Sequence, residues 1–451
     1  MDGARLNFSH GDQAWHAEMI ERIRRVSAEA GRHVAIVADL QGPKIRLGRL
    51  PEEGVELADG SQVVFGPEGS TLPDGALPCG YAALAADVSP GDRMLIDDGR
   101  VEVRVLRAAD GLVTCEVVRG GVVTSGKGLN LPGVAVSSPS VTEKDMSDLY
   151  MAAGAGVDYI AVSFVRSPRD VSDVKAALAG RGADIPVIAK IEKPEALSCL
   201  DAVIDASDGL MVARGDLGVE VEPERVPVLQ KCIIRAANAA GKLVITATQM
   251  LESMVSSPLP TRAEATDVAN SVYDGTDVLM LSGETAVGRY PEAAVRMMSR
   301  IAEEAESDKV WQRYDDPQVK ETTFADVIAE AVVVAARDVG ADAILAFTTW
   351  GSTALKISKR RPGCPVLGVC TTEGAARRGA LYRGVRTVLS EDMSTFEEME
   401  GFANDTAVER GLLRQGDVVL ITAGLPLEVR GITNTMKVHR VGERSAMDVE
   451  V

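Results

Sequence analysis

One stretch, from Pro186 to Gly218, constrains the fold more than any other part of the chain. It holds two short apolar runs, PVIAKI and GLMVAR, which each end in charged residues and are separated by one helix-length polar segment. This spacing is typical of neighbouring parallel strands in a (β/α)8 barrel, whose strands all end at one mouth. We therefore expect Lys190, Glu192 and Asp216, which stand at the ends of these runs, to lie close together.

The residue types at these strand ends predict a magnesium site. Glu192 and Asp216 offer carboxylate oxygens, which magnesium prefers, and leave its other positions for water and a substrate phosphate. Lys190 would add a compact positive charge beside them. A structural ion pair at the barrel rim is the alternative that these residues leave open.

The apolar patterns divide the chain into three domains. Residues 1–46 and 139–320 carry repeated βα units and are predicted to form a catalytic TIM-type (β/α)8 barrel, with Thr142 and Asp145 as a capping box at one helix start. Residues 47–138 carry short alternating runs punctuated by glycine, which predict a small inserted β domain that we call the lid. Residues 321–451 alternate strands and helices and are predicted to form a doubly wound α/β domain, the C-terminal domain.

The barrel pattern contains about seven strands, one fewer than closure requires. The first strand is the one that is missing, and it would precede Met1. An open barrel would expose a strand edge, so we favour an upstream segment as the explanation.

Composition disfavours several kinds of partner. The chain has 48 Lys and Arg against 66 Asp and Glu, a net charge of −18, which argues against generic binding to nucleic acid or to an anionic membrane. Its apolar runs are shorter than the roughly 18 residues that a membrane-spanning helix requires. Six scattered cysteines without a CxxC pair, and a start without an export signal, favour a cytoplasmic protein.

These motifs together resemble those of pyruvate kinase. The matching segments, in the family's order and spacing, are RLNFSHGD, GPKIRLG, GKGLNLPG, VTEKD, KIEKPEA, DGLMVARGDLGVE, TATQMLESM, PTRAEATDVANSVYDGTDVLMLSGETAVGRYP and ISKRRP. The resemblance implies a glycolytic transfer of phosphate from phosphoenolpyruvate to ADP, giving pyruvate and ATP. It also implies a mobile lid, a C-terminal domain that binds a phosphorylated effector, and a homotetramer.

Phosphoryl transfer needs positioning and charge neutralisation more than covalent catalysis. Lys190 is therefore the candidate for neutralising charge on the transferring group. The backbone N–H groups of Gly215 and Asp216, with the hydroxyl of Thr248, would hold the substrate carboxylate. Thr248 and Ser282 are candidates for the proton relay to the enolate, although a hydroxyl that only caps a strand end is an equal alternative for Ser282.

Other positions match the family's motifs residue by residue. Arg5 matches a catalytic and substrate-binding position that faces phosphate, and Arg46 matches one in the nucleotide site. Lys127, in GKGLNLPG, matches a lid lysine that reaches the nucleotide phosphates. Asn7, Ser9 and Asp39 match the family's pocket for a monovalent cation and the nucleotide. We also assign Asn7 to nucleotide binding.

The loop after Asp39 departs from the family's potassium-dependent branch. As the resemblance implies, that branch typically reads Thr-Lys-Gly-Pro-Glu here, with the glutamate helping to hold the ion. This chain reads LQGPK, from Leu40 to Lys44. The ammonium of Lys44 can fill the cation pocket and supply the same unit charge. We therefore expect magnesium to be required and potassium not to be.

The turn TTWGST resembles the family's loop for the effector phosphate. Its candidate residues are Thr348, Thr349, Gly351, Ser352 and Thr353. Trp350 stands where a small or basic residue is expected, and Glu428 in the facing segment LPLEVRGI suits a second phosphate poorly. We therefore expect a sugar monophosphate or a nucleoside monophosphate rather than fructose 1,6-bisphosphate.

Two rival functions stay open on the sequence. Magnesium-dependent aldolases and lyases that act on pyruvate enolates use similar barrels, but they normally lack the lid and the C-terminal domain. A catalytically impaired relative that binds effectors or serves a structural role is the second rival, because the barrel lacks a strand.

Overall fold

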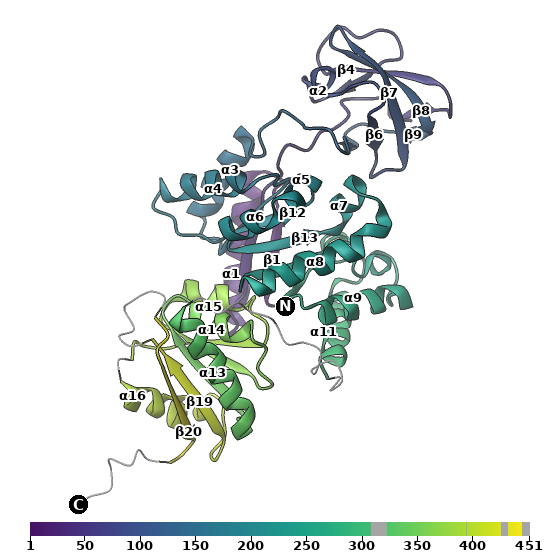
Figure 1. The fold of residues 1–451 in the computed structure, drawn as a ribbon. Helices are drawn as coiled ribbons and strands as arrows, with labels where there is room; N and C mark the ends of the chain where they lie inside the picture. The colour runs from purple at the N-terminus through teal and green to yellow at the C-terminus, as the bar shows by residue number, and fades with distance from the viewer. Residues whose placement is uncertain (308–322, 394, 425–431, 444–451) are drawn as a thin grey trace, which may run out of the picture.

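The computed structural model describes residues 1–307, 323–393, 395–424 and 432–443. The barrel lies at the centre of the molecule, the lid extends from one side of it, and the C-terminal domain packs on the other side (Figure 1).

The barrel sheet is parallel throughout and has seven strands in the order β1-β2-β11-β12-β13-β14-β15. The strands are β1 (Gly3–Asn7), β2 (Ala35–Asp39), β11 (Tyr159–Val162), β12 (Val187–Ile191), β13 (Gly209–Ala213), β14 (Leu243–Ala247) and β15 (Val278–Leu279). This arrangement confirms the TIM-type barrel with seven strands within the described residues. An eighth strand upstream of Met1 stays a prediction.

Helices follow the strands because apolar residues recur along them at helical spacing and pack on the sheet. They are α1 (Gln13–Glu29), α3 (Glu143–Gly154), α4 (Pro168–Ala179), α5 (Pro194–Ser198), α6 (Leu200–Ala206), α7 (Arg214–Glu220), α8 (Val226–Ala239), α9 (Arg262–Asp274), α10 (Gly283–Ala286) and α11 (Pro291–Ser307), with 3-10 turns at Pro223–Arg225 and Glu252–Val255. The predicted capping box at α3 is present, with Thr142 and Asp145 as its two members. Among the helices of the described ranges, none is long and apolar enough to cross a membrane.

The lid has its own apolar core and two small sheets, which form because its strands alternate buried and exposed residues. One sheet has the order β10-β6-β7-β8-β4-β5 and the other pairs β3 with β9. The elements are β3 (Val55–Leu57), β4 (Gln62–Pro67), β5 (Leu77–Cys79), α2 (Leu84–Asp87), β6 (Arg93–Ile96), β7 (Val101–Ala109), β8 (Leu112–Arg119), β9 (Gly121–Val123) and β10 (Leu129–Asn130).

The C-terminal domain is an α/β layer around a five-stranded sheet of order β18-β17-β16-β19-β20, in which only β20 runs antiparallel. Its elements are α13 (Phe324–Val339), β16 (Ala343–Thr348), α14 (Ser352–Ser358), β17 (Val366–Cys370), α15 (Glu373–Gly379), β18 (Val385–Leu389), α16 (Phe396–Gly401), a π-helical segment (Phe402–Thr406), α17 (Ala407–Glu409), β19 (Val418–Ala423) and β20 (Thr435–Arg440). One apolar cluster joins barrel residues such as Ile188 and Met211 to C-terminal residues such as Ile344 and Ile357.

Candidate active site

The strand ends bring a lysine and two carboxylates together inside the barrel. Ile188 packs in the apolar cluster of the barrel interior, and Lys190, two residues further along β12, points to the same side. Its Nζ lies 3.1 Å from Oδ1 of Asp39 and 2.9 Å from Oε1 of Glu192, and it donates a 2.7 Å hydrogen bond to Oγ of Ser163. All of these side chains are buried, which makes their charges interact strongly.

Opposite charges hold Lys190 and Asp39 in their ionised forms. Burial alone would lower the pKa of Lys190, but the carboxylates of Asp39 and Glu192 outweigh burial and raise it above its ordinary value. Burial alone would raise the pKa of Asp39, but Lys190 and Arg5 hold it below its ordinary value. Arg5 donates to Oδ2 of Asp39 through Nε at 2.8 Å and Nη2 at 2.6 Å. Asp39 is therefore held between two cations.

Glu192 and Asp216 fit a magnesium ion. Oε2 of Glu192 accepts the backbone N–H of Phe164 at 2.7 Å, whereas Oε1 is buried and pairs with the ammonium of Lys190 at 2.9 Å. Burial raises the pKa of Glu192, and the charge of Asp216 raises it further, while Lys190 opposes both. A divalent cation bound between the two carboxylates would relieve the repulsion of their charges.

The number of protein ligands also suits magnesium. Among the described residues, no group of three or more His, Cys, Asp or Glu side chains is placed to hold a metal. Magnesium is commonly bound by one or two carboxylates, with water and substrate phosphate at its other positions. Two carboxylates with a substrate are therefore the expected donor set.

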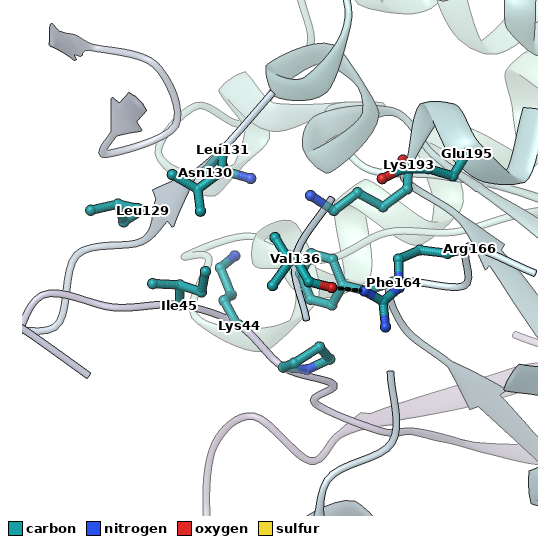
Figure 2. A pocket seen from close by; sticks show the side chains of 11 residues that line it. Lys44, Ile45, Leu129, Asn130, Leu131, Val136, Phe164, Arg166, Lys193 and Glu195 are labelled. Atoms are coloured by element: carbon teal, nitrogen blue, oxygen red, sulfur yellow. Dashed lines mark hydrogen bonds between the residues drawn. The ribbon is translucent and has the colours of Figure 1, made fainter. Parts of the chain in front are cut away.

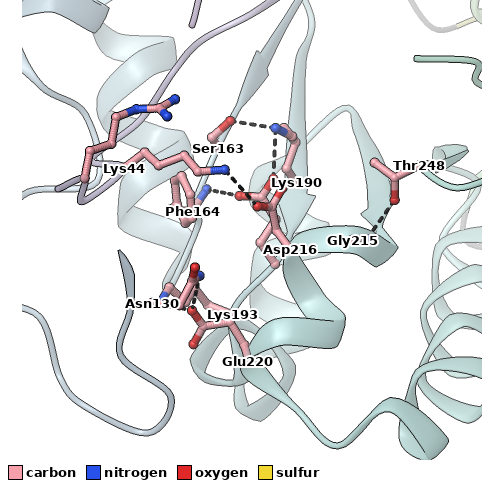
Figure 3. Close-up of polar contacts among 12 residues, drawn as sticks. Lys44, Asn130, Ser163, Phe164, Lys190, Lys193, Gly215, Asp216, Glu220 and Thr248 are labelled. Atoms are coloured by element: carbon pink, nitrogen blue, oxygen red, sulfur yellow. Dashed lines mark hydrogen bonds and ion pairs between the residues drawn. The ribbon is translucent and has the colours of Figure 1, made fainter. Parts of the chain in front are cut away.

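Lys44, which is predicted to fill the pocket for the monovalent cation, lies beside Asp216. Its Nζ lies 3.4 Å from Oδ1 of Asp216, where it forms an ion pair with a partly exposed carboxylate (Figure 3). The oxygens of Asp39 already contact Arg5, Lys190 and, at 3.3 Å, the hydroxyl of Ser163. Asp39 thus has cationic partners of its own, and the filling of the cation pocket by Lys44 stays a prediction.

The backbone N–H of Gly215 is also placed differently from expectation. It donates to Oγ1 of Thr248 at 2.7 Å, and Thr248 in turn donates to the carbonyl of Ala247 at 2.6 Å (Figure 3). Thr248 has a φ of 70°, an unusual value for a β-branched residue. The hydroxyl and the N–H that were expected to face a substrate therefore bind one another.

The remaining predicted residues are placed as follows. Asn7 lies opposite Asp39 in the pairing of β1 with β2, and its Oδ1 accepts the backbone N–H of Ser9 at 3.2 Å. The hydroxyl of Ser282 is buried and has no hydrogen-bond partner. Two further residues lie at the lid: Arg46 donates to the carbonyl of Gly126 at 2.9 Å, and Lys127 pairs with Asp97 at 2.7 Å.

Several residues at the site were not anticipated from the sequence. Ser163 links Lys190 to the chain after β2, because it donates to the carbonyl of Leu40 at 2.7 Å. Lys193 donates to Oε1 of Glu220 at 2.7 Å. The motifs KIEKPEA and DLGVE contain these two charged residues, but nothing in their spacing indicates that they pair.

A pocket lies where the lid joins the barrel. Lid residues such as Leu129 and Asn130 line one side, and Phe164, Arg166 and Lys193 from the barrel line the other (Figure 2). Arg166 donates to the carbonyl of Val136, to the carbonyl of Ser138 at 2.7 Å and to the hydroxyl of Ser140 at 2.9 Å. It thereby ties the chain that returns from the lid to the barrel.

The predicted effector turn caps helix α14. Gly351 has a φ of 90°, and its N–H donates to Oγ1 of Thr348 at 2.9 Å. The hydroxyls of Thr353 and Thr433 are 2.9 Å apart, and Thr372 donates to the carbonyl of Thr349 at 3.4 Å. The facing segment with Glu428 lies outside the described residues.

Two residues of this turn face the barrel. Trp350 and Ser352 line a cavity of about 290 Å³ between the C-terminal domain and the N-terminal ends of the barrel strands. Tyr159 lines it from the barrel, and Arg378 and Tyr382 line it from the C-terminal domain.

Comparison with known proteins decides the family. Residues 1–295 match the family model described as "Pyruvate kinase, barrel domain", and residues 326–439 match "Pyruvate kinase, alpha/beta domain". The chain belongs to the pyruvate kinase family. Family members transfer the phosphoryl group of phosphoenolpyruvate to ADP, so the chain is a phosphotransferase rather than an aldolase or lyase.

Pyruvate kinases from several organisms are similar over nearly the whole chain. The enzyme of Staphylococcus saprophyticus is 45% identical over 99% of this chain and 77% of its own length. That of Clostridium acetobutylicum is 43% identical over 98% of this chain and 94% of its own length. A crystal structure of a pyruvate kinase from Cryptosporidium parvum superposes with a TM-score of 0.90 at 37% identity, covering 98% of this chain and 91% of the other.

Proposed function

We propose that the buried cluster around Lys190 is the site of phosphoryl transfer between phosphoenolpyruvate and ADP. The observation that carries this proposal is the ammonium of Lys190, fixed between Asp39 and Glu192 at 3.1 and 2.9 Å. A cation held rigidly in a buried site stabilises charge that develops on a transferring group, because it needs no reorganisation during the reaction. Lys190 thus faces the transferring phosphoryl, and Arg5 assists it from β1.

Glu192 and Asp216 would hold the magnesium ion. When bound, the ion supplies a positive charge that neutralises the phosphoryl and carboxylate oxygens of the substrate and orients them. Phe164 fixes one oxygen of Glu192 and leaves the other for the ion. Lys44, paired with Asp216, keeps a further positive charge at this edge of the site.

The hydroxyls of Thr248 and Ser282 are the proposed proton relay to the enolate. Ser282 has a buried hydroxyl without a hydrogen-bond partner, so it can receive or donate a proton without breaking a bond of its own. Thr248 must first release the carbonyl of Ala247, to which it donates. Gly215 and Asp216 would hold the substrate carboxylate once the hydroxyl of Thr248 turns away from the N–H of Gly215.

The nucleotide would lie between the barrel and the lid. Asn7 on β1 and Arg46 and Lys127 at the lid are its proposed contacts. Lys127 would leave its partner Asp97 to reach the phosphates, which is possible because its side chain is 38% exposed. An assay of pyruvate release with Lys127→Met tests this role: we expect a higher KM for ADP with little change in the KM for phosphoenolpyruvate.

We further propose that the reaction requires no potassium. The two cations on Asp39 support this, because they already neutralise the carboxylate expected to share a monovalent ion with Asn7 and Ser9. Lys44 adds its charge beside Asp216. Rates in buffer with a bulky organic cation and in the same buffer with potassium chloride test the proposal. We expect the native chain to give equal rates in the two buffers. Lys44→Glu replaces a cation by a carboxylate beside Asp216 and should create a potassium requirement. Strong activation of the native chain by potassium would refute the proposal.

The effector and the assembly are proposals of the same kind. We propose a sugar monophosphate or nucleoside monophosphate at the turn 348–353, where Trp350 offers an aromatic face and Ser352 a hydroxyl. Calorimetric titration should show that a monophosphate binds and that Ser352→Asp removes this binding. Tight binding of a bisphosphate would contradict the proposed effector class.

We propose a homotetramer, which light scattering tests. A cytoplasmic location is supported by the six cysteines, all of which are free thiols.

A further inference from the structure

A buried carboxylate, Glu220, joins the lid to the barrel. It is the last residue of α7, its side chain is 1% exposed, and Lys193 donates to its Oε1 at 2.7 Å. The amide of Asn130, in the last strand of the lid, donates to the same oxygen at 3.0 Å. Figure 3 shows the side chains of Asn130, Lys193 and Glu220 close together. A buried charge with both partners in place is a rigid contact.

Two of these residues, Lys193 and Glu220, are connected along the chain to the proposed magnesium ligands. Lys193 directly follows Glu192 in the chain. Glu220 lies four residues after Asp216 on α7, which places the two carboxylates on the same face of the helix, one turn apart. A movement of Glu220 therefore moves the helix that carries Asp216, and a movement of Lys193 moves the chain that carries Glu192.

The contact through Asn130 is separate from the anchor of the returning chain. Arg166 holds Val136, Ser138 and Ser140, which lie beyond Asn130. Asn130 belongs to the lid sheet, where it pairs with Leu95 of β6. A rotation of the lid about the anchored segment thus breaks the bond from Asn130 to Glu220 without disturbing the anchor.

We propose that Glu220 is a positioning residue through which the lid sets the separation and orientation of the two magnesium carboxylates. Asn130 is the contact from the lid, and Lys193 is the charge partner in the barrel. The proposal rests on the assignment of Glu192 and Asp216 as the metal ligands. Because linkage is reciprocal, metal binding favours the lid position in which Asn130 contacts Glu220, and that position tightens metal binding.

Binding of Mn²⁺ to the full chain without substrates tests the proposal, with free Mn²⁺ measured by electron paramagnetic resonance. We expect Asn130→Ala to weaken Mn²⁺ binding about fivefold to tenfold. Such a change lies in the lower part of the range that coupling between two sites typically gives. In a Glu220→Ala background, which lacks the oxygen that Asn130 contacts, Asn130→Ala should have no further effect, because a residue that acts through another shows a non-additive double mutant. Asn130→Asp keeps the size of the side chain but faces Glu220 with a second carboxylate, so it should weaken binding at least as much.

The controls separate this proposal from the assignment of the metal site. Gln62→Ala removes an exposed amide of the lid and should leave Mn²⁺ binding unchanged. Glu192→Gln should nearly abolish binding; if it does not, the metal assignment itself is wrong. If Glu192→Gln abolishes binding but Asn130→Ala and Asn130→Asp bind Mn²⁺ like the native chain, or if the double mutant is additive, the coupling through Glu220 is refuted. Melting temperatures of all variants show whether a loss of binding is a loss of folding.

Discussion

At the scale of single residues, Lys190 joins the two buried carboxylates of the site, and we expect its charge to serve both folding and catalysis. Replacing it by methionine removes the cation from Asp39 and Glu192 and leaves Glu192 without a basic partner. We expect Lys190→Met to lower kcat by at least about 100-fold, as for other preorganised charges. We also expect a lower melting temperature, because breaking a buried ion pair typically costs about 3–5 kcal/mol.

Asp216→Ala separates catalysis from stability. Asp216 is partly exposed and pairs only loosely with Lys44, so its loss should change the melting temperature little. Turnover should nevertheless fall by about 100-fold or more, because a metal ligand is lost. Steady-state rates and thermal melts of Lys190→Met and Asp216→Ala check the expected losses of turnover and stability. Near-normal turnover of either variant with magnesium would contradict the assigned roles.

The titration of Glu192 predicts how magnesium binding depends on pH. Burial and the charge of Asp216 raise its pKa above the ordinary value of about 4.3, despite the opposing effect of Lys190. Magnesium needs the ionised carboxylate, so the affinity should rise with pH through this raised pKa and level off above it. Calorimetry over the pH range in which the chain stays folded measures this. An affinity that does not fall as the pH is lowered would contradict the raised pKa.

The lowered pKa of Asp39 predicts how the stability of the fold depends on pH. Burial acts to raise its pKa, but Lys190 and Arg5 lower it overall. A carboxyl with a lowered pKa stabilises the fold above its unfolded pKa of about 3.9, and this contribution is lost as the pH falls through the lowered value. Acid unfolding curves of the native chain and Asp39→Asn should therefore converge at low pH; curves that stay equally far apart would contradict the prediction.

At the scale of elements, the sequence predicted strands and helices well because their apolar periodicity reflects burial. The run VIAKI is buried at every position, as expected for a strand covered on both faces, and the capping box at Thr142 is present. Partners across the site could not be predicted in the same way. Lys44 contacts Asp216, 172 positions later, and that choice depends on where other cations already lie. Sequence patterns report local periodicity, whereas such pairs depend on the assembled fold.

Gly42, in the loop that leads to the lid, makes a prediction about element packing. Its φ is 69°, and an added Cβ would lie 2.7 Å from the ring of Phe164, whose N–H fixes Glu192. Gly42→Ala should therefore displace Phe164 and lower kcat, by about tenfold if one hydrogen bond to Glu192 is lost. Gly31→Ala is the matched control, since Gly31 has a φ of 60° but open space around it. Equal effects of the two substitutions on kcat would show that packing against Phe164 is unimportant.

At the scale of the whole molecule, the C-terminal domain is fastened to the barrel by buried ion pairs. Lys359, just after α14, is 1% exposed and lies 2.7 Å from Asp277, which precedes β15. Burial lowers the pKa of Lys359, although Asp277 opposes this. Arg377 of α15 similarly contacts Asp158 before β11 at 2.9 Å.

Lys359→Met tests this fastening. It leaves Asp277 buried without its lysine, so we expect about 3–5 kcal/mol less stability and faster proteolysis between the domains. Lys356→Met is the control, because Lys356 pairs with Asp326 within the C-terminal domain and is 30% exposed. Its effect on stability should be smaller. Identical melting temperatures for Lys359→Met and the native chain would contradict the role of this pair.

The most direct test of the account is an assay of pyruvate and ATP formed from phosphoenolpyruvate and ADP by residues 1–451, with magnesium and without potassium. We expect the native chain to form equal amounts of the two products at a rate that depends on magnesium. We expect Asp216→Ala to lose nearly all turnover. A folded native chain that forms no pyruvate under these conditions, or an Asp216→Ala variant that turns over like the native chain, would contradict the account.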